Sequence, residues 1–347
     1  MKHLLTFLIC VFFLFFGCSS NNGEKKGKEL SSNNKLQIGL VFDIGGRGDK
    51  SFNDSAYNGL EMAKKQYGVN FLYVEPQGEG ADREAALRQM ASDPDIGLII
   101  GVGLLFSDDI TKIAAEFPDK KFACIDYNRK QGLAIPVNLQ GIVFEEKKGS
   151  YLAGVLAGLV SRKKTVGFIG GMESNIIKKF ESGFIAGVHS VNPDIKVLSG
   201  YIGMTGSAFA NPSKGKELAL GQYARGADII YEAAGASGLG VIEAARETKK
   251  LVICTDRDQE PEAPGFVLTS MTKAVDKSVM KTVERVLDKS FKGGTVSVFG
   301  IADRYTDYVY NEKNAALIGT KNQEIVESIR NKIMKGEIVV NETSVEQ

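Results

Sequence analysis

The sequence is poor in the residues that most catalytic and metal sites require. It has only two histidines in 347 residues, no tryptophan and four cysteines. A Ser-His-Asp triad or a histidine-rich zinc site therefore has almost nothing to be built from. The phosphate-binding pattern GxxxxGK[ST] does not occur, and the glycines at positions 45, 46 and 48 do not fit GxGxxG. We expect no metal, no cofactor and no enzymatic reaction.

The charged residues are balanced in number and dispersed along the chain. Lysine and arginine total 43, aspartate and glutamate total 42, and the formal net charge is +1 at pH 7. A nucleic-acid-binding protein would carry clustered positive charge. We therefore expect no nucleic-acid partner.

The N-terminus has the composition of a secretory signal peptide. A basic start is followed by an almost uninterrupted apolar run over residues 4–16, and then by Gly17 and Cys18. The run is shorter than the ~20 residues that a membrane-spanning helix needs. A cysteine after this small residue is similar to the lipobox of bacterial lipoproteins, in which Cys18 would be acylated. An ordinary cleaved signal with an incidental cysteine is the alternative.

These features predict a signal peptide at 1–17 and a lipid-anchored protein of the cell envelope. The anchor would lie at the periplasmic face of the inner membrane or at the cell surface. Residues 18–35 are almost all polar and cannot bury enough apolar surface to fold, so we expect a flexible tether. Beyond them, Cys124 and Cys254 stand in apolar runs, where free cysteine behaves as a small buried hydrophobe. A disulfide framework is not expected.

From residue 36 on, apolar strands alternate with amphipathic helices, which predicts parallel sheets covered on both faces. Local signals mark the helix ends: Ser107 as an N-cap, Asn211 before Pro212 as another, and Gly68 as a stop. The expected strands are 37–43, 70–75, 96–101, 121–126, 165–170, 195–201, 228–232 and 251–255. The expected helices are 53–67, 82–90, 107–117, 175 onward, 212–224 and 238–249.

The two halves of this pattern resemble each other. A glycine pair follows the first strand of each half, at 45–46 and at 170–171, and Cys-x-Asp ends the fourth strand of each, at 124–126 and at 254–256. Chance could produce so short a match. We nevertheless predict an α/β protein of two similar lobes. A soluble helix at 144–161 would lie between them, and its GxxxG glycines would allow close packing.

Three aspartates stand at the carboxyl ends of predicted strands: Asp43, Asp126 and Asp256. Ligands of open parallel sheets bind outside these ends, so the three could face one cleft. Each could instead be an ordinary turn former. A site rich in carboxylates accepts hydrogen bonds and repels anions, which suits a neutral ligand with O–H and N–H donors, such as a sugar or a nucleoside.

Three phenylalanines could supply stacking surfaces for a planar base. Phe52 begins a predicted helix among polar residues, where it would either stack on a ligand or act as a hydrophobic staple. In the second half, Phe180 lies on the apolar stripe of its helix, which favours core packing. Phe209 lies in a loop with no periodic pattern, so we favour it for stacking.

Four motifs together resemble the basic membrane protein family of lipoproteins, of the purine nucleoside receptor type. They are VFDIGGRGDKSFNDSAYNGL at 41–60, FEEKKGSYLAGVLAGL at 144–159, GGMES followed by FESGFIAGV from 170, and the two Cys-x-Asp strand ends. The resemblance implies a type I periplasmic-binding-protein fold, with two doubly wound lobes joined by three crossings and a ligand cleft between them. It also implies a monomer that passes adenosine, guanosine or inosine to the permease and ATPase subunits of an ABC transporter.

The resemblance implies lobe boundaries as well. The N-terminal lobe would comprise 36–143 plus about 272–302, and the C-terminal lobe 144–271 plus about 303–347. It implies nine ligand-binding positions: Asp43, Phe52, Asn53, Asp126, Phe180, Phe209, Gly235, Asp256 and Lys273. Among them, Asp43 and Asp126 would hydrogen-bond the base and Phe52 would stack on it.

The remaining implied roles concern the second half of the chain. Phe209 or Phe180 would form the opposite stacking surface. Asp256 would accept the ribose hydroxyls, with Asp258 as a residue that could share or replace its role. Gly235 would let the backbone approach the ligand, and Lys273 would donate to the sugar.

Three alternatives remain at this stage. A sugar-binding protein of the same fold fits the same aspartates. A surface adhesin is suggested by the lipid anchor and by the tripeptide Arg47-Gly48-Asp49, although so short a motif can occur by chance. A nucleoside hydrolase is weaker, because the aspartates are far apart in sequence and form no dense acidic motif.

Overall fold

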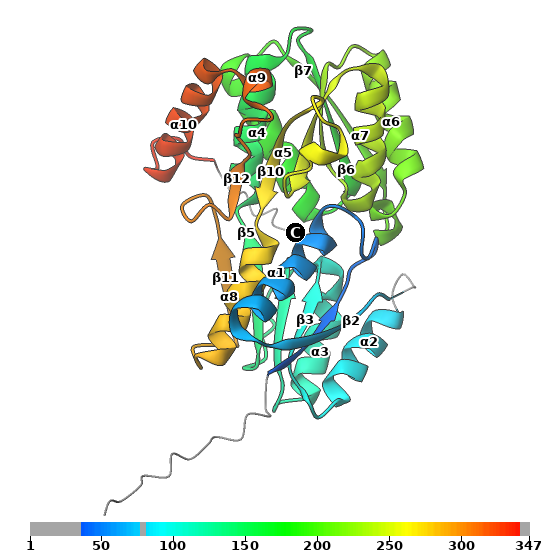
Figure 1. The fold of residues 1–347 in the computed structure, drawn as a ribbon, viewed down its shortest axis with the longest axis vertical. Helices are drawn as coiled ribbons and strands as arrows, with labels where there is room; N and C mark the ends of the chain where they lie inside the picture. The colour runs from blue at the N-terminus through cyan, green and yellow to red at the C-terminus, as the bar shows by residue number, and fades with distance from the viewer. Residues whose placement is uncertain (1–35, 77–80, 341–347) are drawn as a thin grey trace, which may run out of the picture. The chain divides into compact units, whose positions relative to one another are not determined.

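The structure is a computed structural model that describes residues 36–76 and 81–340. The predicted signal peptide, Cys18 and the whole predicted tether lie outside the described residues. Within the described part the chain forms two six-stranded sheets (Figure 1). No helix among these residues is both long and apolar enough to cross a bilayer.

The first sheet has the strand order β11-β5-β4-β3-β1-β2, and all of its strands are parallel. Its members are β1 (Gln37–Val41), β2 (Asn70–Val74), β3 (Ile96–Val102), β4 (Lys121–Ile125), β5 (Leu139–Phe144) and β11 (Thr295–Phe299). Short apolar runs rich in Ile, Val and Phe fill the central strands, as expected for strands buried on both faces.

The second sheet has the order β12-β10-β9-β8-β6-β7, and only β12 runs antiparallel. Its members are β6 (Thr165–Met172), β7 (Lys196–Gly203), β8 (Ile229–Ala233), β9 (Leu251–Asp256), β10 (Val267–Lys273) and β12 (Thr306–Tyr308). The first five strands of each half thus occupy equivalent places in their sheets. β2 and β3 lie on opposite sides of β1, and β7 and β8 lie on opposite sides of β6. The predicted two-lobed parallel α/β architecture is confirmed.

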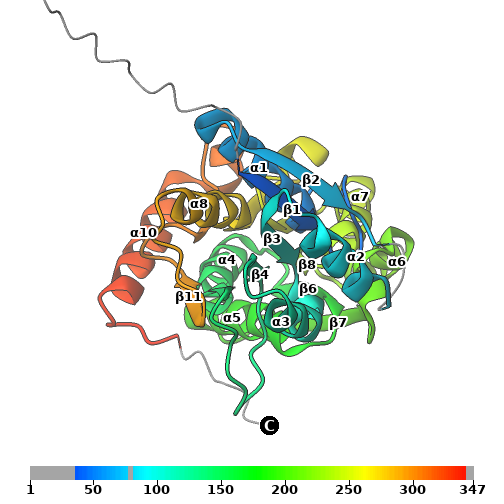
Figure 2. The same ribbon diagram turned by 90° about the horizontal axis from the view of Figure 1, so that it is seen from below.

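Helices cover both faces of each sheet (Figure 2). α1 packs against α8 on one face of the first sheet and α2 against α3 on the other, while α4 with α5, and α6 with α7, cover the second sheet. The bounds are α1 (Phe52–Tyr67), α2 (Ala81–Ser92), α3 (Ser107–Glu116), α4 (Glu146–Val160), α5 (Asn175–Val191), α6 (Pro212–Ala224), α7 (Gly238–Thr248), α8 (Val275–Leu287), α9 (Ala315–Ile318) and α10 (Thr320–Met334). Short 3-10 turns are η1 (Leu104–Phe106), η2 (Gly206–Phe209), η3 (Gly235–Ser237) and η4 (Glu260–Glu262).

The chain passes from one sheet to the other after β5, after β10 and after β11. α4 follows β5 of the first sheet but packs on the second; β10 belongs to the second sheet, whereas α8 beyond it packs on the first. β10 runs on to Lys273, slightly past the expected boundary at 271. The boundaries themselves stay a prediction.

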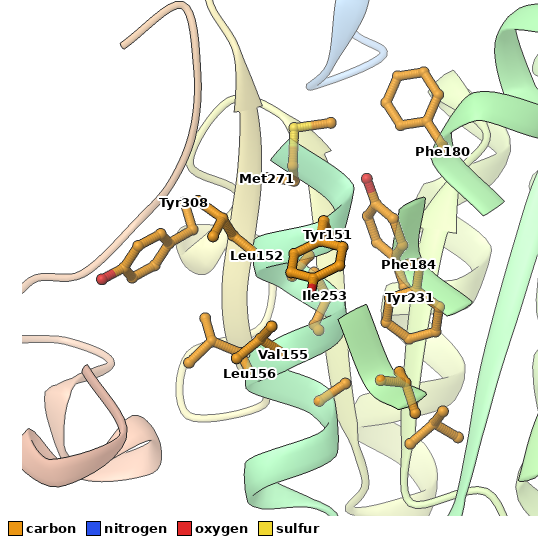
Figure 3. Close-up of a cluster of buried hydrophobic side chains, with 14 of the residues drawn as sticks. Tyr151, Leu152, Val155, Leu156, Phe180, Phe184, Tyr231, Ile253, Met271 and Tyr308 are labelled. Carbon is orange, nitrogen blue, oxygen red and sulfur yellow. The ribbon is translucent and has the colours of Figure 1, made fainter. Parts of the chain in front are cut away.

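α4, the helix expected between the lobes, packs closely against α5 through glycines on both helices. A side chain at Gly154 of α4 would overlap the backbone of Phe184 on α5, and one at Gly187 of α5 would overlap the backbone of Tyr151. Tyr231 and Phe184 lie in the same core cluster, and Phe180 stands at its border (Figure 3). The expected close packing of the 144–161 segment is confirmed.

Most of the local signals are confirmed, and two are wrong. Gly68 ends α1 with φ 69°, and Asn211 caps α6 by accepting the Lys214 N–H at 3.0 Å. Ser107 is not an N-cap: it is already helical because η1 leads directly into α3, and its hydroxyl donates to the Leu104 carbonyl. The pair at 170–171 does not follow β6 but lies inside it, so the expected glycine repeat is not structurally equivalent to 45–46.

Candidate functional site

A cavity opens at the carboxyl ends of strands from both sheets. It encloses about 560 Å³, solvent-open space included. Every one of the nine predicted positions lines it: Asp43, Phe52, Asn53, Asp126, Phe180, Phe209, Gly235, Asp256 and Lys273. The geometry thus brings the nine together; their contacts with a ligand stay a prediction.

Asp43 is held at the end of β1 by its neighbours. Its backbone N–H donates to Oδ1 of Asn53 at 3.0 Å, and its own Oδ1 accepts the Ile44 N–H at 2.8 Å. Gly103 lies against its carboxyl group with φ 107°, and a side chain there would overlap that group. Burial raises the pKa of Asp43 to about 7. Asn53, predicted as a ligand contact, therefore also positions Asp43.

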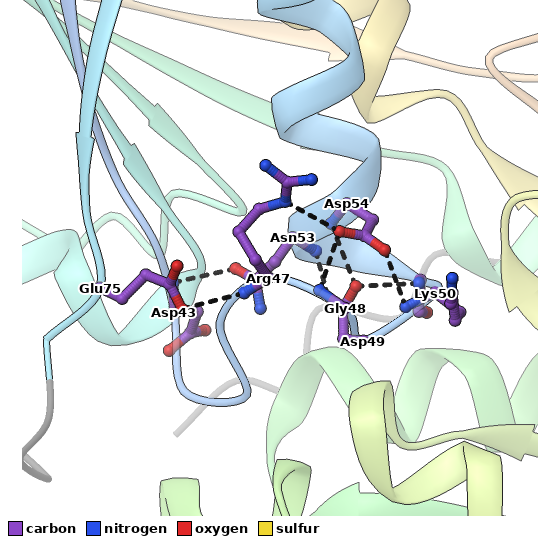
Figure 4. Close-up of polar contacts among 9 residues, drawn as sticks. Asp43, Arg47, Gly48, Asp49, Lys50, Asn53, Asp54 and Glu75 are labelled. Atoms are coloured by element: carbon purple, nitrogen blue, oxygen red, sulfur yellow. Dashed lines mark hydrogen bonds and ion pairs between the residues drawn. The ribbon is translucent and has the colours of Figure 1, made fainter.

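Glycines allow the loop between β1 and α1 to turn tightly, and hydrogen bonds to Asp49 and Asp54 fix its conformation (Figure 4). Gly45, Gly46 and Gly48 all have positive φ, as a tight turn requires. Asp49 is 2% exposed and accepts the N–H groups of Ser51, Asn53 and Asp54, so it caps α1. This capping fixes the direction in which Phe52 enters the cavity.

The Arg-Gly-Asp tripeptide is engaged within the protein. Arg47 donates from Nε to Asp54 at 3.1 Å, and its guanidinium lies 3.4 Å from the centre of the Tyr57 ring. The Asp49 carboxylate is buried beneath the loop as described above. The tripeptide therefore does not present a free carboxylate to a receptor.

Lys273 lies at the centre of the polar network. It is 2% exposed, and its Nζ is 2.6 Å from Oδ2 of Asp126 and 3.4 Å from Oε1 of Glu146. Burial lowers the pKa of Lys273, but the surrounding carboxylates outweigh burial and raise it. The ammonium also lies 5.0 Å from the Phe52 ring centre and 5.5 Å from that of Phe180. Lys273, predicted as a sugar donor, is thus ion-paired with Asp126, the residue predicted to bind the base.

Asp256 connects the two sheets on the other side of the cavity. It ends β9 with φ 73°, as Asp126 follows β4 with φ 58°, so the repeated Cys-x-Asp has the same backbone conformation in both lobes. The Ser51 hydroxyl donates to Oδ2 of Asp256. Burial raises the pKa of Asp256 to about 7, against the opposing effect of Lys273. Asp258 does not line the cavity and accepts hydrogen bonds from Glu260 and Asn311 instead.

Both candidate phenylalanines of the second lobe reach the cavity. Phe180 is 3% exposed and belongs to the core cluster, whereas Phe209 is half-buried at the end of η2. Gly171 allows the Phe209 ring to lie against β6, because a side chain there would overlap the ring. Gly235 has φ 57° and stands close to the Phe209 backbone. The geometry does not select one of the two rings for stacking.

Sequence reasoning missed four polar residues that shape the site: Ser51, Asp49, Glu146 and Glu232. Glu232 accepts the N–H groups of Ala234 and Thr255, and burial raises its pKa to about 8. The D-x-S-x-N spacing before α1 was a usable capping signal for Asp49. Glu146 lies in the charged run at 145–148 and Glu232 in an apolar strand, and neither position gave a comparable signal.

The assembled cavity is rich in hydrogen-bond acceptors and aromatic surface. Three carboxyl groups and one ammonium are its ionisable groups beside Asp49. Among the described residues no group of three or more His, Cys, Asp or Glu side chains is arranged to hold a metal ion. Cys124 and Cys254 are both buried free thiols, as predicted.

Comparison with known proteins agrees with this geometry. Residues 36–344 match the family model described as ABC transporter substrate-binding protein PnrA-like. Basic membrane protein A of Borreliella afzelii is 32% identical, over 94% of this chain and 95% of that protein. The CD4+ T-cell-stimulating antigen of Listeria monocytogenes is 32% identical, over 97% of both chains. An uncharacterized lipoprotein of Pyrococcus abyssi is 30% identical, over 81% of this chain and 70% of that protein.

Solved structures show the same fold. An ABC transporter solute-binding protein from Aeropyrum pernix K1 superimposes with a TM-score of 0.80 at 25% identity, covering 89% of this chain and 94% of that one. One from Conexibacter woesei superimposes with a TM-score of 0.69 at 22% identity, covering 88% and 98%, which bears on the fold alone. With the family match, the cavity and the two-lobed fold, the chain belongs to the basic membrane protein family of ABC transporter substrate-binding proteins.

Proposed function

We propose that this substrate-binding protein captures purine nucleosides outside the cytoplasm and delivers them to an ABC transporter. The observation that carries the proposal is the lining of one cavity by three carboxyl groups and three phenylalanine rings from both lobes. A purine base offers flat faces for the rings and N–H donors for the carboxylates, and the ribose offers hydroxyl donors.

The geometry supports a division of the cavity into two sides. Asp43 and Phe52, on the first lobe, and Asp126 near them would hold the base. Asp256 and Gly235, on the second lobe, would receive the ribose. Phe180 or Phe209 would cover the face of the base opposite Phe52. Lys273 would donate to the sugar while remaining paired with Asp126.

Isothermal titration tests the nucleoside assignment directly. Adenosine, guanosine and inosine are each titrated into the purified protein, with free ribose and AMP as comparison ligands. We expect nucleosides to bind at least about tenfold more tightly than AMP, since a phosphate dianion near Asp126 and Asp256 is repelled. Tight binding of ribose alone would instead establish the sugar-binding alternative, and AMP binding better than adenosine would exclude the nucleoside assignment.

A separate incubation tests for catalysis. Incubation of the protein with adenosine is expected to yield no free adenine, because no histidine lines the cavity and no three His, Cys, Asp or Glu side chains of the described residues are grouped to hold a water-activating metal. Chromatographic detection of adenine above a protein-free control would show a hydrolase.

We also propose that Cys18 carries the lipid anchor, which the name of the Pyrococcus relative supports. Mass spectrometry of the protein purified from membranes would show an acylated N-terminal peptide beginning at Cys18. An unmodified N-terminal peptide would instead indicate an ordinary secreted protein without a lipid anchor.

The motif behind the adhesin alternative is not accessible, because Asp49 is buried and caps α1.

A further inference from the structure

A second chamber adjoins the cavity just described. It also encloses about 560 Å³, solvent-open space included, and it shares Leu104, Asp126 and Ile176 with the first. Its own lining includes Glu146 at the start of α4 and Ser174 and Lys179 at the start of α5. Asp126 therefore lines both chambers.

Several buried polar atoms in this lining lack hydrogen-bond partners. Neither carboxyl oxygen of Glu146, which is 0% exposed, accepts a hydrogen bond from another described residue. The same holds for Oδ1 of Asp126 and for the hydroxyl of Ser174. A buried polar atom without a partner is unfavourable, because it has lost its hydrogen bonds to water. The residues that carry these atoms, Asp126, Glu146 and Ser174, all line the second chamber, so a small rotation of their side chains would let a group bound there satisfy them.

The surrounding charges indicate what kind of group fits. Lys273 and Lys179 place their ammonium nitrogens 3.4 and 3.7 Å from the two carboxyl oxygens of Glu146. Two ammonium groups thus balance the carboxylates of Asp126 and Glu146, so the chamber does not require a cation. An anionic group would be repelled by the carboxylates of Asp126 and Glu146. A neutral group that donates O–H or N–H hydrogen bonds satisfies the vacant acceptors without adding charge.

We propose that the second chamber is a subsite for a neutral hydrogen-bond-donating substituent on the base of a bound nucleoside. This inference rests on the proposed function, in which Asp126 contacts the base. Because Asp126 lines both chambers, the base edge that faces Asp126 is directed toward the second chamber, and a short substituent on that edge would enter it. The receptor would accept base-modified nucleosides whose added group carries a hydroxyl or another neutral hydrogen-bond donor.

Two matched pairs of ligands test the proposal by isothermal titration. N6-(2-hydroxyethyl)adenosine is compared with N6-propyladenosine, which has the same number of added heavy atoms but no donor. The corresponding 2-substituted pair probes the other side of the same edge, and unmodified adenosine is the reference. At one of the two positions we expect the hydroxyethyl ligand to bind at least about tenfold more tightly than the propyl ligand.

The outcomes separate this inference from the proposed function. Failure of adenosine itself to bind would overturn both. Binding of adenosine with rejection of all four substituted ligands, or with equal affinity within both pairs, would overturn the subsite alone.

Variants then locate the preference in the second chamber. Ser174→Ala and Glu146→Gln are each expected to reduce the hydroxyethyl-to-propyl preference at least about threefold. The matched control is Ser190→Ala on the same helix, whose hydroxyl donates to the Gly187 carbonyl, and it should keep the wild-type ratio. Full retention of the preference in both chamber variants would contradict the assignment. If a variant fails to fold, the wild-type ratios still decide the question.

Discussion

Lys273 and Asp126 form a buried ion pair that joins the two sheets. Lys273 is the last residue of β10 in the second sheet, Asp126 follows β4 in the first, and Nζ and Oδ2 are 2.6 Å apart. Glu146 adds a second carboxylate at 3.4 Å. Lys273 therefore contacts two buried carboxylates at the wall of the ligand cavity, and Lys179 approaches the other oxygen of Glu146 at 3.7 Å.

Replacing this lysine should destabilise the protein strongly. Lys273→Met leaves Asp126 and Glu146 buried without their shared cation, which costs about 3–5 kcal/mol of unfolding free energy. Burial already raises the pKa of Glu146, and without the opposing ammonium of Lys273 this folded pKa rises further. A raised folded pKa gives stability that is lost as pH increases, and the destabilisation should be larger at pH 8 than at pH 5.

Urea denaturation at both pH values measures this effect. Lys281→Met is the matched control, because Lys281 is exposed on α8 and pairs only with Glu284. An exposed pair of this kind contributes at most about 1 kcal/mol. A loss at Lys273 no greater than at Lys281 would show that the buried pair is unimportant for stability.

Phe52 is the residue through which aromatic stacking can be tested most cleanly. Phe52→Ala should weaken adenosine binding by about 1–3 kcal/mol, which is roughly a 5- to 150-fold rise in Kd. Phe71→Ala is the control: Phe71 lies on β2, contacts Tyr57 and does not line the cavity. If Phe52 served only as a hydrophobic staple, its replacement would lower stability and leave the Kd unchanged.

Ligand affinity should depend on pH around neutrality. Burial raises the pKa of both Asp43 and Asp256 to about 7, so both are partly protonated at pH 6. A ligand that donates O–H or N–H hydrogen bonds prefers the ionised carboxylate. Affinity for adenosine should therefore increase between pH 6 and pH 8, by about tenfold for each group that must ionise.

Titration calorimetry across this pH range checks the sign. Adenosine itself does not titrate there, so the change belongs to the protein. Asp43→Asn cannot ionise and should flatten the profile. A tighter Kd at pH 6 than at pH 8 would mean that protonated carboxyl groups donate to ring nitrogens of the base.

The two-lobed fold was predictable because its signals are local and repeated. Residues close together in the sequence determine where apolar strands and amphipathic helices form. They also determine where helices begin and end, as Asn211 and Gly68 do here. The wrong prediction at Ser107 has a physical reason. Its hydroxyl could have capped α3, but η1 continues into the helix and leaves no end to cap.

The cavity was predictable only in part. Asp43, Asp126 and Asp256 follow strands whose carboxyl ends meet, so strand topology alone brings them together. Glu146 reaches the network only because α4 leaves the first sheet and packs on the second. No sequence spacing encodes that contact, just as none encodes the Ser51 to Asp256 hydrogen bond between lobes.

Asp49 provides the test of whether the Arg-Gly-Asp tripeptide has any adhesive role. Its carboxylate accepts three backbone N–H groups, so Asp49→Ala should cost about 1–3 kcal/mol of stability and disturb Phe52. Asp119→Ala, in the exposed turn before β4, should cost less than about 0.5 kcal/mol. A soluble Arg-Gly-Asp peptide should not reduce attachment of the purified protein to cultured cells. Competition by that peptide would show that the loop opens and exposes Asp49, contrary to its burial in the cap.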